Sequence, residues 1–322
     1  MQQIRNSSGY AMDDTKVDVL INVFGKPYQT ALSILSLLKW SGSHIDKIYF
    51  HEEPCTSEFE RKDHSALLDW LEGRLVHFHV PFWLSSNTTD EERLRRDEQY
   101  RLSMRYQYGW ENTQKKYALL VHNDIEVKGD ILGELLQNIG PCTATGELGQ
   151  CWWCPAGQRG FCSSERYEEF RPKYHQLMYI YNTDMDYKER RAYNLGLKAE
   201  FWENPWPLPE CRVNEWCMLV DMEKARPDTF PFGAAMPLGA FCASGSKIGE
   251  DWEDIVNLDT GVQWFRDMNH LGHKFIHYPI ERYIKHDRRG RVALIHPDKY
   301  VTNEVLAKKI LQEEYPEFYS AM

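Results

Sequence analysis

No apolar run in the chain approaches the ~20 residues that a membrane-spanning helix needs. The first residues, MQQIRNSSGYAMDD, also lack the apolar core of a secretory signal. Neither an internal repeat nor a low-complexity tract is present. These absences predict a cytoplasmic protein with no transmembrane segment. In a reducing compartment the eight cysteines are expected to be thiols or metal ligands and not disulfides.

Basic residues are in the minority: 38 Lys and Arg stand against 48 Asp and Glu, which gives a formal net charge of −10. Binding to nucleic acid needs many Lys and Arg contacts with phosphates, so this balance predicts no nucleic-acid partner. It also weighs against an obligate anionic membrane surface, although a local basic patch would still allow peripheral membrane association. The length of 322 residues allows one large domain or two ordinary ones.

The most informative stretch is YALLVHNDIEVKGDILGELL, residues 117–136. Its first five residues are apolar or aromatic and show no helical period, which is typical of a strand buried on both faces of a mainly parallel sheet. The run ends abruptly in His122, Asn123 and Asp124. An acidic residue at the carboxyl end of a buried strand lies where open α/β sheets bind their ligands.

Strands and helices alternate through the first half of the chain, which indicates an α/β unit with a parallel sheet. The expected strands are 17–24, 47–51, 75–80 and 117–121, and the expected helices are 29–39, 67–71 and a long charged helix over 88–108. The second half has weaker periodicity. It contains a strand-like run at 216–220, a helix that follows Asp259, a strand that ends at Pro279, and a closing helix at 303–314.

The opening strand and helix, VDVLINVFGKPYQTALSILSLL, and the HND sequence at 122–124 resemble those of family 2-like GT-A-fold nucleotide-sugar glycosyltransferases. Asp124 takes the place of the last Asp of their DXD motif, which ligates a divalent cation, and His122 stands where the first Asp is usual. The resemblance implies a GT-A-like, Rossmann-type, mostly parallel sheet flanked by helices, and a bound Mn²⁺ or Mg²⁺ ion.

The same resemblance implies a set of donor-side residues. The metal ligands would be Asp124, His122 and His286, with His286 in the YIKHDRRGR sequence and His296 as its runner-up. The nucleotide-binding residues would be Val23, Phe24, Gly25, Glu52, Glu53, Asn123 and Arg288.

On the acceptor side, the LDTG sequence at 258–261 resembles the motif whose Asp is the usual catalytic-base candidate in these enzymes. A carboxylate within hydrogen-bond reach can take the proton from an attacking hydroxyl group. Asp259 is therefore the expected base, with Asp251 and Asp254 as alternates. The position of Asp259 equally suits the N-cap of a helix.

A Cys- and Trp-rich region, 141–217, contains the CWWCPAGQRGFC sequence. Its thiols are Cys151, Cys154 and Cys162, and Cys211 or Cys217 would complete a tetrahedral structural zinc site. The alternative is a set of buried free thiols among the tryptophans.

The expected organisation is a flexible tail over 1–15, a GT-A-like domain over 16–300 and a C-terminal helix over 301–322. The domain divides into a nucleotide-sugar half, 16–135, and an acceptor half, 136–300, with the Cys/Trp-rich insertion at 141–217. The function implied by the resemblance is metal-dependent, inverting transfer of a sugar from a nucleotide-sugar donor to a glycan, lipid-linked or other hydroxyl acceptor. The alternatives are a nucleotidyltransferase on the same fold and a non-enzymatic, zinc-stabilised carbohydrate-binding protein.

Overall fold

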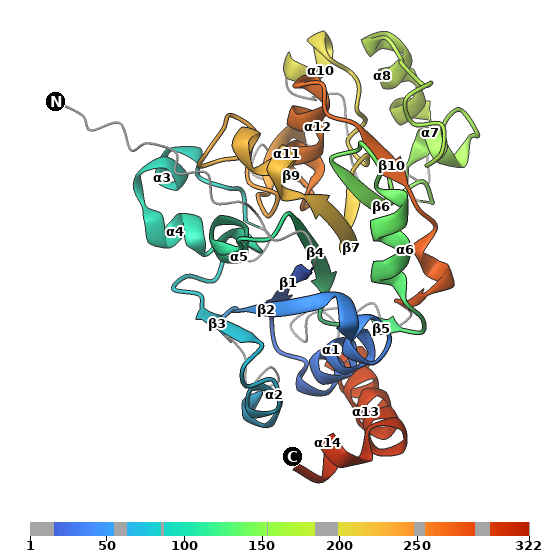
Figure 1. Cartoon of the computed structure of the whole chain (residues 1–322). Helices are drawn as coiled ribbons and strands as arrows, with labels where there is room; N and C mark the ends of the chain where they lie inside the picture. Colours follow the sequence, from blue (N-terminus) through green and yellow to red (C-terminus); the bar gives the residue numbers. More distant parts are fainter. Residues whose placement is uncertain are drawn as a thin grey trace, which may run out of the picture.

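A computed structural model of the chain describes residues 16–54, 63–84, 87–152, 154–183, 199–247, 255–286 and 297–321 (Figure 1). A seven-stranded sheet with the order β10-β6-β7-β4-β1-β2-β3 forms its centre. Its strands are β1 (Val17–Val23), β2 (Ile45–Glu52), β3 (Leu75–His79), β4 (Tyr117–His122), β6 (Ala144–Leu148), β7 (Val213–Asp221) and β10 (Phe275–His277). Neighbouring strands pair in parallel except at β7, which runs antiparallel to both β4 and β6. The α/β fold class with a mostly parallel sheet is thus confirmed.

Two short antiparallel pairs flank the main sheet. One joins β5 (Glu126–Val127) to β11 (Ile284–Lys285), and the other joins β8 (Cys242–Lys247) to β9 (Ile255–Leu258). The first pair matters for the site, because it brings the segment around residue 285 next to the chain that leaves β4.

Helices cover both faces of the sheet. On one face the apolar core includes buried side chains of α1 (Pro27–Ser41), α2 (Ser65–Trp70), α6 (Ile131–Asn138), α13 (Pro297–Glu314) and α14 (Pro316–Ala321). On the other face it includes side chains of α5 (Gln107–Asn112), α8 (Tyr174–Thr183), α10 (Ala199–Glu203), α11 (Met222–Asp228) and α12 (Val262–His270). The other helical segments of the described residues are η1 (Gly42–His44), α3 (Glu91–Arg96), α4 (Glu98–Leu102), α7 (Pro155–Gln158) and η3 (Ile280–Arg282).

The predicted buried strand is β4, and its side chains contribute to the apolar cores on both faces of the sheet. Ala118 and Leu120 belong to one core, whereas Leu119 and Val121 belong to the other, and all four side chains are fully buried. Successive side chains of a strand point to opposite faces, so one apolar run supplies both layers.

The prediction of one long helix over 88–108 was wrong, because the segment forms the three short helices α3, α4 and α5. Asp97 ends the first of them in an extended conformation, and its carboxylate accepts a hydrogen bond from the Tyr100 amide to start the second. Tyr106 then adopts a left-handed conformation with φ of 66° before α5. Asp side chains compete with the helix for backbone amides, so an Asp in a charged run can divide a helix.

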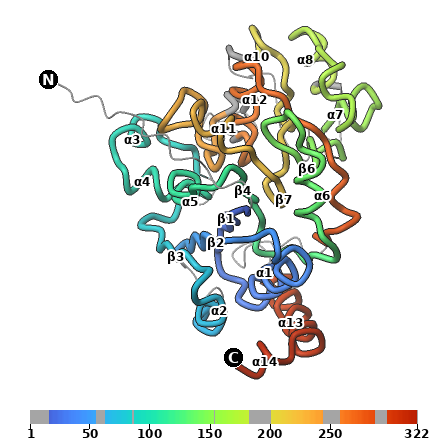
Figure 2. Tube along the Cα trace, in the orientation of Figure 1, coloured from blue at the N-terminus to red at the C-terminus, as the bar shows by residue number. Residues whose placement is uncertain are grey.

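The C-terminal helix α13 lies beside α1 (Figure 2). Residue 26, which precedes α1, provides no side-chain cap. Instead, the buried carboxylate of Glu304 accepts hydrogen bonds from the backbone amides of Tyr28 and Gln29, at 3.0 and 3.1 Å. The first amides of a helix lack intrahelical partners, so a side chain distant in sequence here supplies the cap. Within the described ranges, no helix combines the length and apolar composition that a membrane span requires.

We expect Gly239→Ala to lower the free energy of unfolding by about 1–3 kcal/mol, because an added methyl group overpacks this position. A Cβ atom there would stand 2.4 Å from the carbonyl oxygen and 2.8 Å from the amide nitrogen of Arg105. Urea denaturation would measure the change.

The matched control is Gly42→Ala, where the backbone is right-handed helical and the nearest atoms lie 3.8 Å from the added Cβ. This variant should be as stable as the wild type or slightly more stable. Equal stability of Gly239→Ala and the wild type would contradict the close approach of these two backbone segments.

Candidate active site

The candidate site lies at the edge of the sheet where the parallel strands β1, β2 and β4 end. Val23 lies opposite Glu52, and Asn22 lies opposite His122, so these strands end together. Strand β7 runs the other way, and its Cys217 lies opposite Val121. The first residues of β7 therefore reach the same edge, which is the edge where open α/β sheets bind their ligands.

Three residues predicted as metal ligands come together here. The ligand atoms of His122, Asp124 and His286 all lie within 4.8 Å of one another. The Asp124 Oδ1 atom is 3.2 Å from His286 Nε2 and 3.7 Å from His122 Nδ1. His286 reaches Asp124 because it directly follows β11, which pairs with β5.

One carboxylate oxygen and two imidazole nitrogens form a mixed donor set. Mg²⁺ prefers oxygen ligands in near-ideal octahedral geometry, whereas the transition ions accept imidazole more readily. The residues present therefore fit a divalent cation, and they suit Mn²⁺ better than Mg²⁺.

Lys26 neutralises the other side of Asp124. Its Nζ atom lies 2.8 Å from Asp124 Oδ2, and both side chains are buried. Burial alone would raise the pKa of Asp124, but Lys26, His286 and His122 together hold it well below its usual value. The carboxylate is thus ionised, and its Oδ1 atom faces the two imidazoles. Lys26 reaches this position from a left-handed backbone conformation, with φ of 56°, at the start of α1.

A line of polar contacts connects Asp124 with Asp259 through three side chains, His122, Glu215 and Arg212. His122 Nε2 lies 3.4 Å from Glu215 Oε1, and Glu215 Oε2 lies 3.5 Å from Arg212 Nε. Arg212 Nη1 in turn lies 3.0 Å from Asp259 Oδ2. Burial would raise the pKa of Glu215, but Arg212 and His122 lower it, so Glu215 stays ionised between its two partners.

Asp259 precedes α12 and does not serve as its N-cap, since Gly261 takes that place with φ of 82°. The Oδ1 atom of Asp259 accepts a hydrogen bond from the Thr260 amide at 2.9 Å. Its side chain is 35% exposed, in contrast to Arg212 at 6%. A well-anchored carboxylate is thus open to solvent at the end of a buried charge network.

The neighbouring acids Glu52 and Glu53 point in different directions. Glu53 Oε1 accepts hydrogen bonds from Asn22 Nδ2 at 2.7 Å and from Arg105 Nε at 3.3 Å. Its Oε2 atom is buried and has no hydrogen-bond partner among the described residues. Glu52 instead faces three histidines on the other side of β2. Burial would raise the pKa of Glu52, but hydrogen bonds and charges from His64 and His77 lower it to about 2.

The other described residues that were predicted to bind the nucleotide lie at or beside the loop after β1. The Asn123 Nδ2 atom donates hydrogen bonds to the Gly25 carbonyl oxygen and to Thr30 Oγ1, at 3.3 and 3.1 Å, and so holds this loop against β4. The Phe24 ring stacks on Trp83 with ring centroids 5.5 Å apart, and Val23 is fully buried. The predicted residues Asp251, Asp254, Arg288 and His296 lie outside the described residues.

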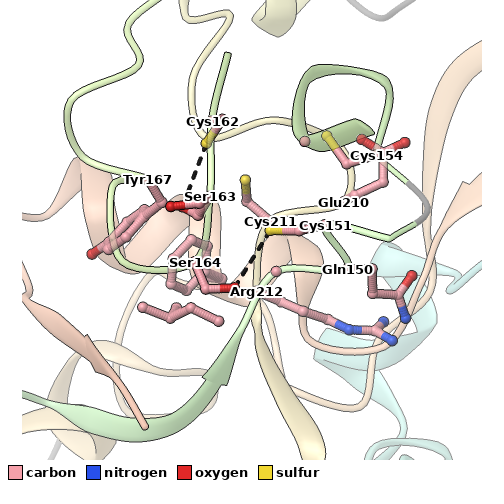
Figure 3. A pocket seen from close by; sticks show the side chains of 14 residues that line it. Gln150, Cys151, Cys154, Cys162, Ser163, Ser164, Tyr167, Glu210, Cys211 and Arg212 are labelled. Carbon is pink, nitrogen blue, oxygen red and sulfur yellow. Dashed lines mark hydrogen bonds between the residues drawn. The ribbon is translucent and has the colours of Figure 1, made fainter. Parts of the chain in front are cut away.

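Four of the five candidate zinc ligands line one small cavity. Figure 3 shows Cys151, Cys154, Cys162 and Cys211 around it. Cys217 lies in β7 and belongs to the core on the opposite face of the sheet. Burial raises the pKa of each of the four thiols, and that of Cys162 reaches about 11. Among the described residues no three of these sulfur atoms lie within 4.8 Å of one another, so a tetrahedral site would require them to move inward.

The sequence alone did not single out Lys26, Arg105, Arg212 or Glu215. Arg212 and Glu215 precede the predicted strand at 216–220, whereas β7 begins at Val213. The signal was therefore present in the CRVNEW sequence, where an Arg and a Glu lie three residues apart at a strand start.

No family model matches this chain, and no curated protein matches it in sequence. Two solved structures cover most of it. The mannosyltransferase PcManGT from Pyrobaculum calidifontis, in complex with GDP-Man and Mn²⁺, has 10% identity and a TM-score of 0.40 over 85% of this chain and 59% of its own. The glucosyl-3-phosphoglycerate synthase from Mycobacterium tuberculosis, in complex with Mn²⁺, UDP and phosphoglyceric acid, has 9% identity and a TM-score of 0.39 over 82% of this chain and 68% of its own.

A third structure, GalNAc-T7 with UDP, GalNAc and Mn²⁺, has 12% identity and a TM-score of 0.30. The match covers 40% of this chain and 22% of that one. These three structures are of glycosyltransferases, the class of enzyme that the sequence resemblance names. At such TM-scores the likeness says nothing about activity, so the function must be inferred from the chain's own residues.

Proposed function

We propose that the protein is a metal-dependent glycosyltransferase that moves a sugar from a nucleotide-sugar donor to a hydroxyl group of a glycan or lipid-linked acceptor. The observation that carries the proposal is the meeting of His122, Asp124 and His286 at the carboxyl edge of a mostly parallel sheet. These residues lie up to 164 positions apart in sequence (286 − 122), and a purely structural role does not require a buried carboxylate flanked by two imidazoles.

On the donor side, the Oδ1 atom of Asp124 together with His122 and His286 would hold Mn²⁺, with Mg²⁺ as a poorer fit. A divalent cation at this position would neutralise the charge that develops on the leaving diphosphate. Lys26 keeps the Asp124 carboxylate ionised and occupies its Oδ2 atom at 2.8 Å. The carboxylate is therefore oriented with one oxygen toward the cation position.

For the nucleotide, Glu53 is a better candidate than Glu52. Its buried Oε2 atom has no hydrogen-bond partner among the described residues and can accept one from a ribose hydroxyl or a base amino group. The loop of Val23, Phe24 and Gly25, held by Asn123, would form the floor beside it. Arg288 stays a candidate phosphate contact in the part of the chain outside the described residues.

For the acceptor, Asp259 would be the general base of an inverting reaction. Arg212 and the Thr260 amide hold the Asp259 carboxylate in one orientation, while a third of the side chain stays exposed to an incoming hydroxyl group. Arg212 fixes the position of the Asp259 carboxylate, and a base must first be within hydrogen-bond reach of the proton. Asp251 and Asp254 are the alternates.

The proposal includes a structural zinc ion held by Cys151, Cys154, Cys162 and Cys211, without Cys217. Its support is that these four thiols line one cavity. A zinc ion would bind them as thiolates, and the protons would be released on binding. The ion would fix the insertion next to Arg212, which also lines the cavity.

We expect Asp124→Ala to abolish sugar transfer and the Mn²⁺-dependent binding of nucleoside diphosphates, because the only carboxylate of the proposed cation site is removed. A panel of nucleotide sugars would measure transfer, and calorimetry with UDP and GDP, with and without Mn²⁺, would measure binding. Removing one partner of a buried ion pair lowers the free energy of unfolding by about 3–5 kcal/mol. Asp124→Asn, which keeps the shape of the side chain, is therefore measured as a second variant.

The control for this experiment is Asp46→Ala, a partly exposed carboxylate at the opposite end of β2. It should keep both activities. Binding of UDP or GDP by a folded Asp124 variant with undiminished dependence on Mn²⁺ would refute the site.

We expect Asp259→Asn to lower kcat by ~10²–10⁴, the usual loss when a positioned base is removed, with little change in donor affinity. Steady-state kinetics with saturating donor would measure kcat, and calorimetry would measure donor binding. The control is Asp228→Asn, which changes a half-exposed Asp at the end of α11. A rate within a few-fold of the wild type would exclude Asp259 as the base and leave Asp251 and Asp254.

We expect Cys211→Ser to lose about one zinc ion per chain and to unfold at a lower temperature, because a structural zinc site contributes directly to folding. Elemental analysis of protein purified without added metal would measure the zinc content. Cys217→Ala, which changes a thiol in the other core, should keep the ion. If both variants held as much zinc as the wild type, or if all the thiols of native wild type reacted freely, the cysteine site would be wrong.

A further inference from the structure

A second group of side chains with suitable ligand atoms for a metal ion lies on the far side of β2 from Glu53. The Glu52 carboxylate stands at the end of β2, and three imidazoles converge on it. Its Oε2 atom is 2.8 Å from His77 Nε2 and 3.3 Å from His79 Nδ1, and its Oε1 atom is 2.8 Å from His64 Nδ1. Nothing in the proposed sugar transfer uses these histidines.

The pairing of β2 with β3 creates this arrangement. Glu52 lies opposite His79, so the two side chains share one face of the sheet. His77 and His79 are two residues apart on β3, and alternate residues of a strand point to the same side. Their ring centroids lie 4.1 Å apart. As a result the ligand atoms of Glu52, His77 and His79 all lie within 4.8 Å of one another.

Two imidazole nitrogens and one carboxylate oxygen are a donor set that zinc uses in proteins when a water molecule completes its tetrahedron. The His79 side chain is 77% exposed, so the fourth position faces solvent. We propose that Glu52, His77 and His79 form a separate binding site for a divalent transition ion of the Zn²⁺ class.

His64 would be a positioning residue for this site. Its side chain is 2% exposed, with Nδ1 at 2.8 Å from Glu52 Oε1 and Nε2 at 3.3 Å from the Gly25 carbonyl oxygen. The partners that hold a ligating carboxylate in place raise metal affinity by fixing its orientation. An ion bound through Oε2 would leave the contact between Oε1 and His64 intact. The site is thereby tied to the loop that carries Lys26, although its three ligands are distinct from those around Asp124.

The chemistry separates this site from the other two. The Asp124 site has an ion pair with Lys26 on one carboxylate oxygen, whereas no Lys or Arg side chain of the described residues forms an ion pair with Glu52. The cysteine cavity offers sulfur ligands. A Co²⁺ ion at Glu52, His77 and His79 would therefore lack the charge-transfer absorption that thiolate ligands produce.

The test compares the binding of Zn²⁺ to the full chain and to the His77→Ala/His79→Ala variant, by calorimetry after removal of metal with a chelator. The wild type should bind one more Zn²⁺ per chain than the double variant, or bind this ion at least ~100-fold more tightly, since loss of even the supporting residues of a metal site costs 10–100-fold. A titration with Mg²⁺ should give the same heat for the wild type and for the double variant. His175→Ala, an exposed histidine on α8, is the matched control and should bind Zn²⁺ like the wild type.

The site can be separated from the proposed catalytic and structural metals in the same experiment. Asp124→Asn and Cys211→Ser should each keep the Zn²⁺ ion that depends on His77 and His79. Circular dichroism checks the fold of the variants, and His79→Ala alone, at a highly exposed position, replaces the double variant if that variant unfolds. Equal Zn²⁺ stoichiometry and affinity for the wild type and the histidine variants would overturn the proposal and leave three histidines that only hydrogen-bond to a carboxylate.

Discussion

The buried charge of Asp124 is the constraint on which the site depends. Moving a carboxylate out of water is costly unless opposite charges and hydrogen bonds surround it. Lys26 supplies the charge at 2.8 Å, and His286 and His122 face the other oxygen. These partners come from the loop after β1, the end of β11 and the end of β4, so three separate parts of the chain must be placed correctly at once. The C-terminal helix α13 also holds Lys26 and the start of α1 in place. Glu304 caps α1, and the Tyr300 hydroxyl accepts a hydrogen bond from the Lys26 amide at 3.3 Å.

The antiparallel strand β7 links the two halves of the chain. In a fully parallel sheet, the residues at its start would lie at the opposite edge from Asp124. Because β7 is reversed, Arg212 and Glu215 lie beside the end of β4. They extend the charge network from His122 to Asp259, which precedes α12. Removal of any single member would take one partner away from a buried neighbour, so the network fixes its members relative to one another.

Two adjacent residues at the end of β2, Glu52 and Glu53, contribute to two different candidate sites. Successive side chains leave a strand on opposite faces. Glu53 faces Asn22 and Arg105 on the side of the charge network, whereas Glu52 faces His64, His77 and His79 on the side of α2. The strand thereby separates a candidate nucleotide contact from a candidate transition-metal site. The two sites still meet at the loop after β1, through the contact of His64 with the Gly25 carbonyl oxygen.

The sequence alone determined the buried strand at 117–121, the α/β alternation of the first half, and the choice of Asp124, His286 and Asp259 as candidate site residues. Those features depend on side-chain patterns of neighbouring residues or on short motifs, and both can be read locally. The division of the segment at 88–108 into three helices was not predicted, because the left-handed Tyr106 and the capping role of Asp97 depend on what each can contact in the folded chain. Only the tertiary structure decided that β11 pairs with β5 and so places His286 next to Asp124, that β7 is reversed, and that Lys26 turns toward Asp124. The reason is physical: pairing between distant segments and the burial of charge are settled by the packing of the whole molecule, and no local pattern carries that information.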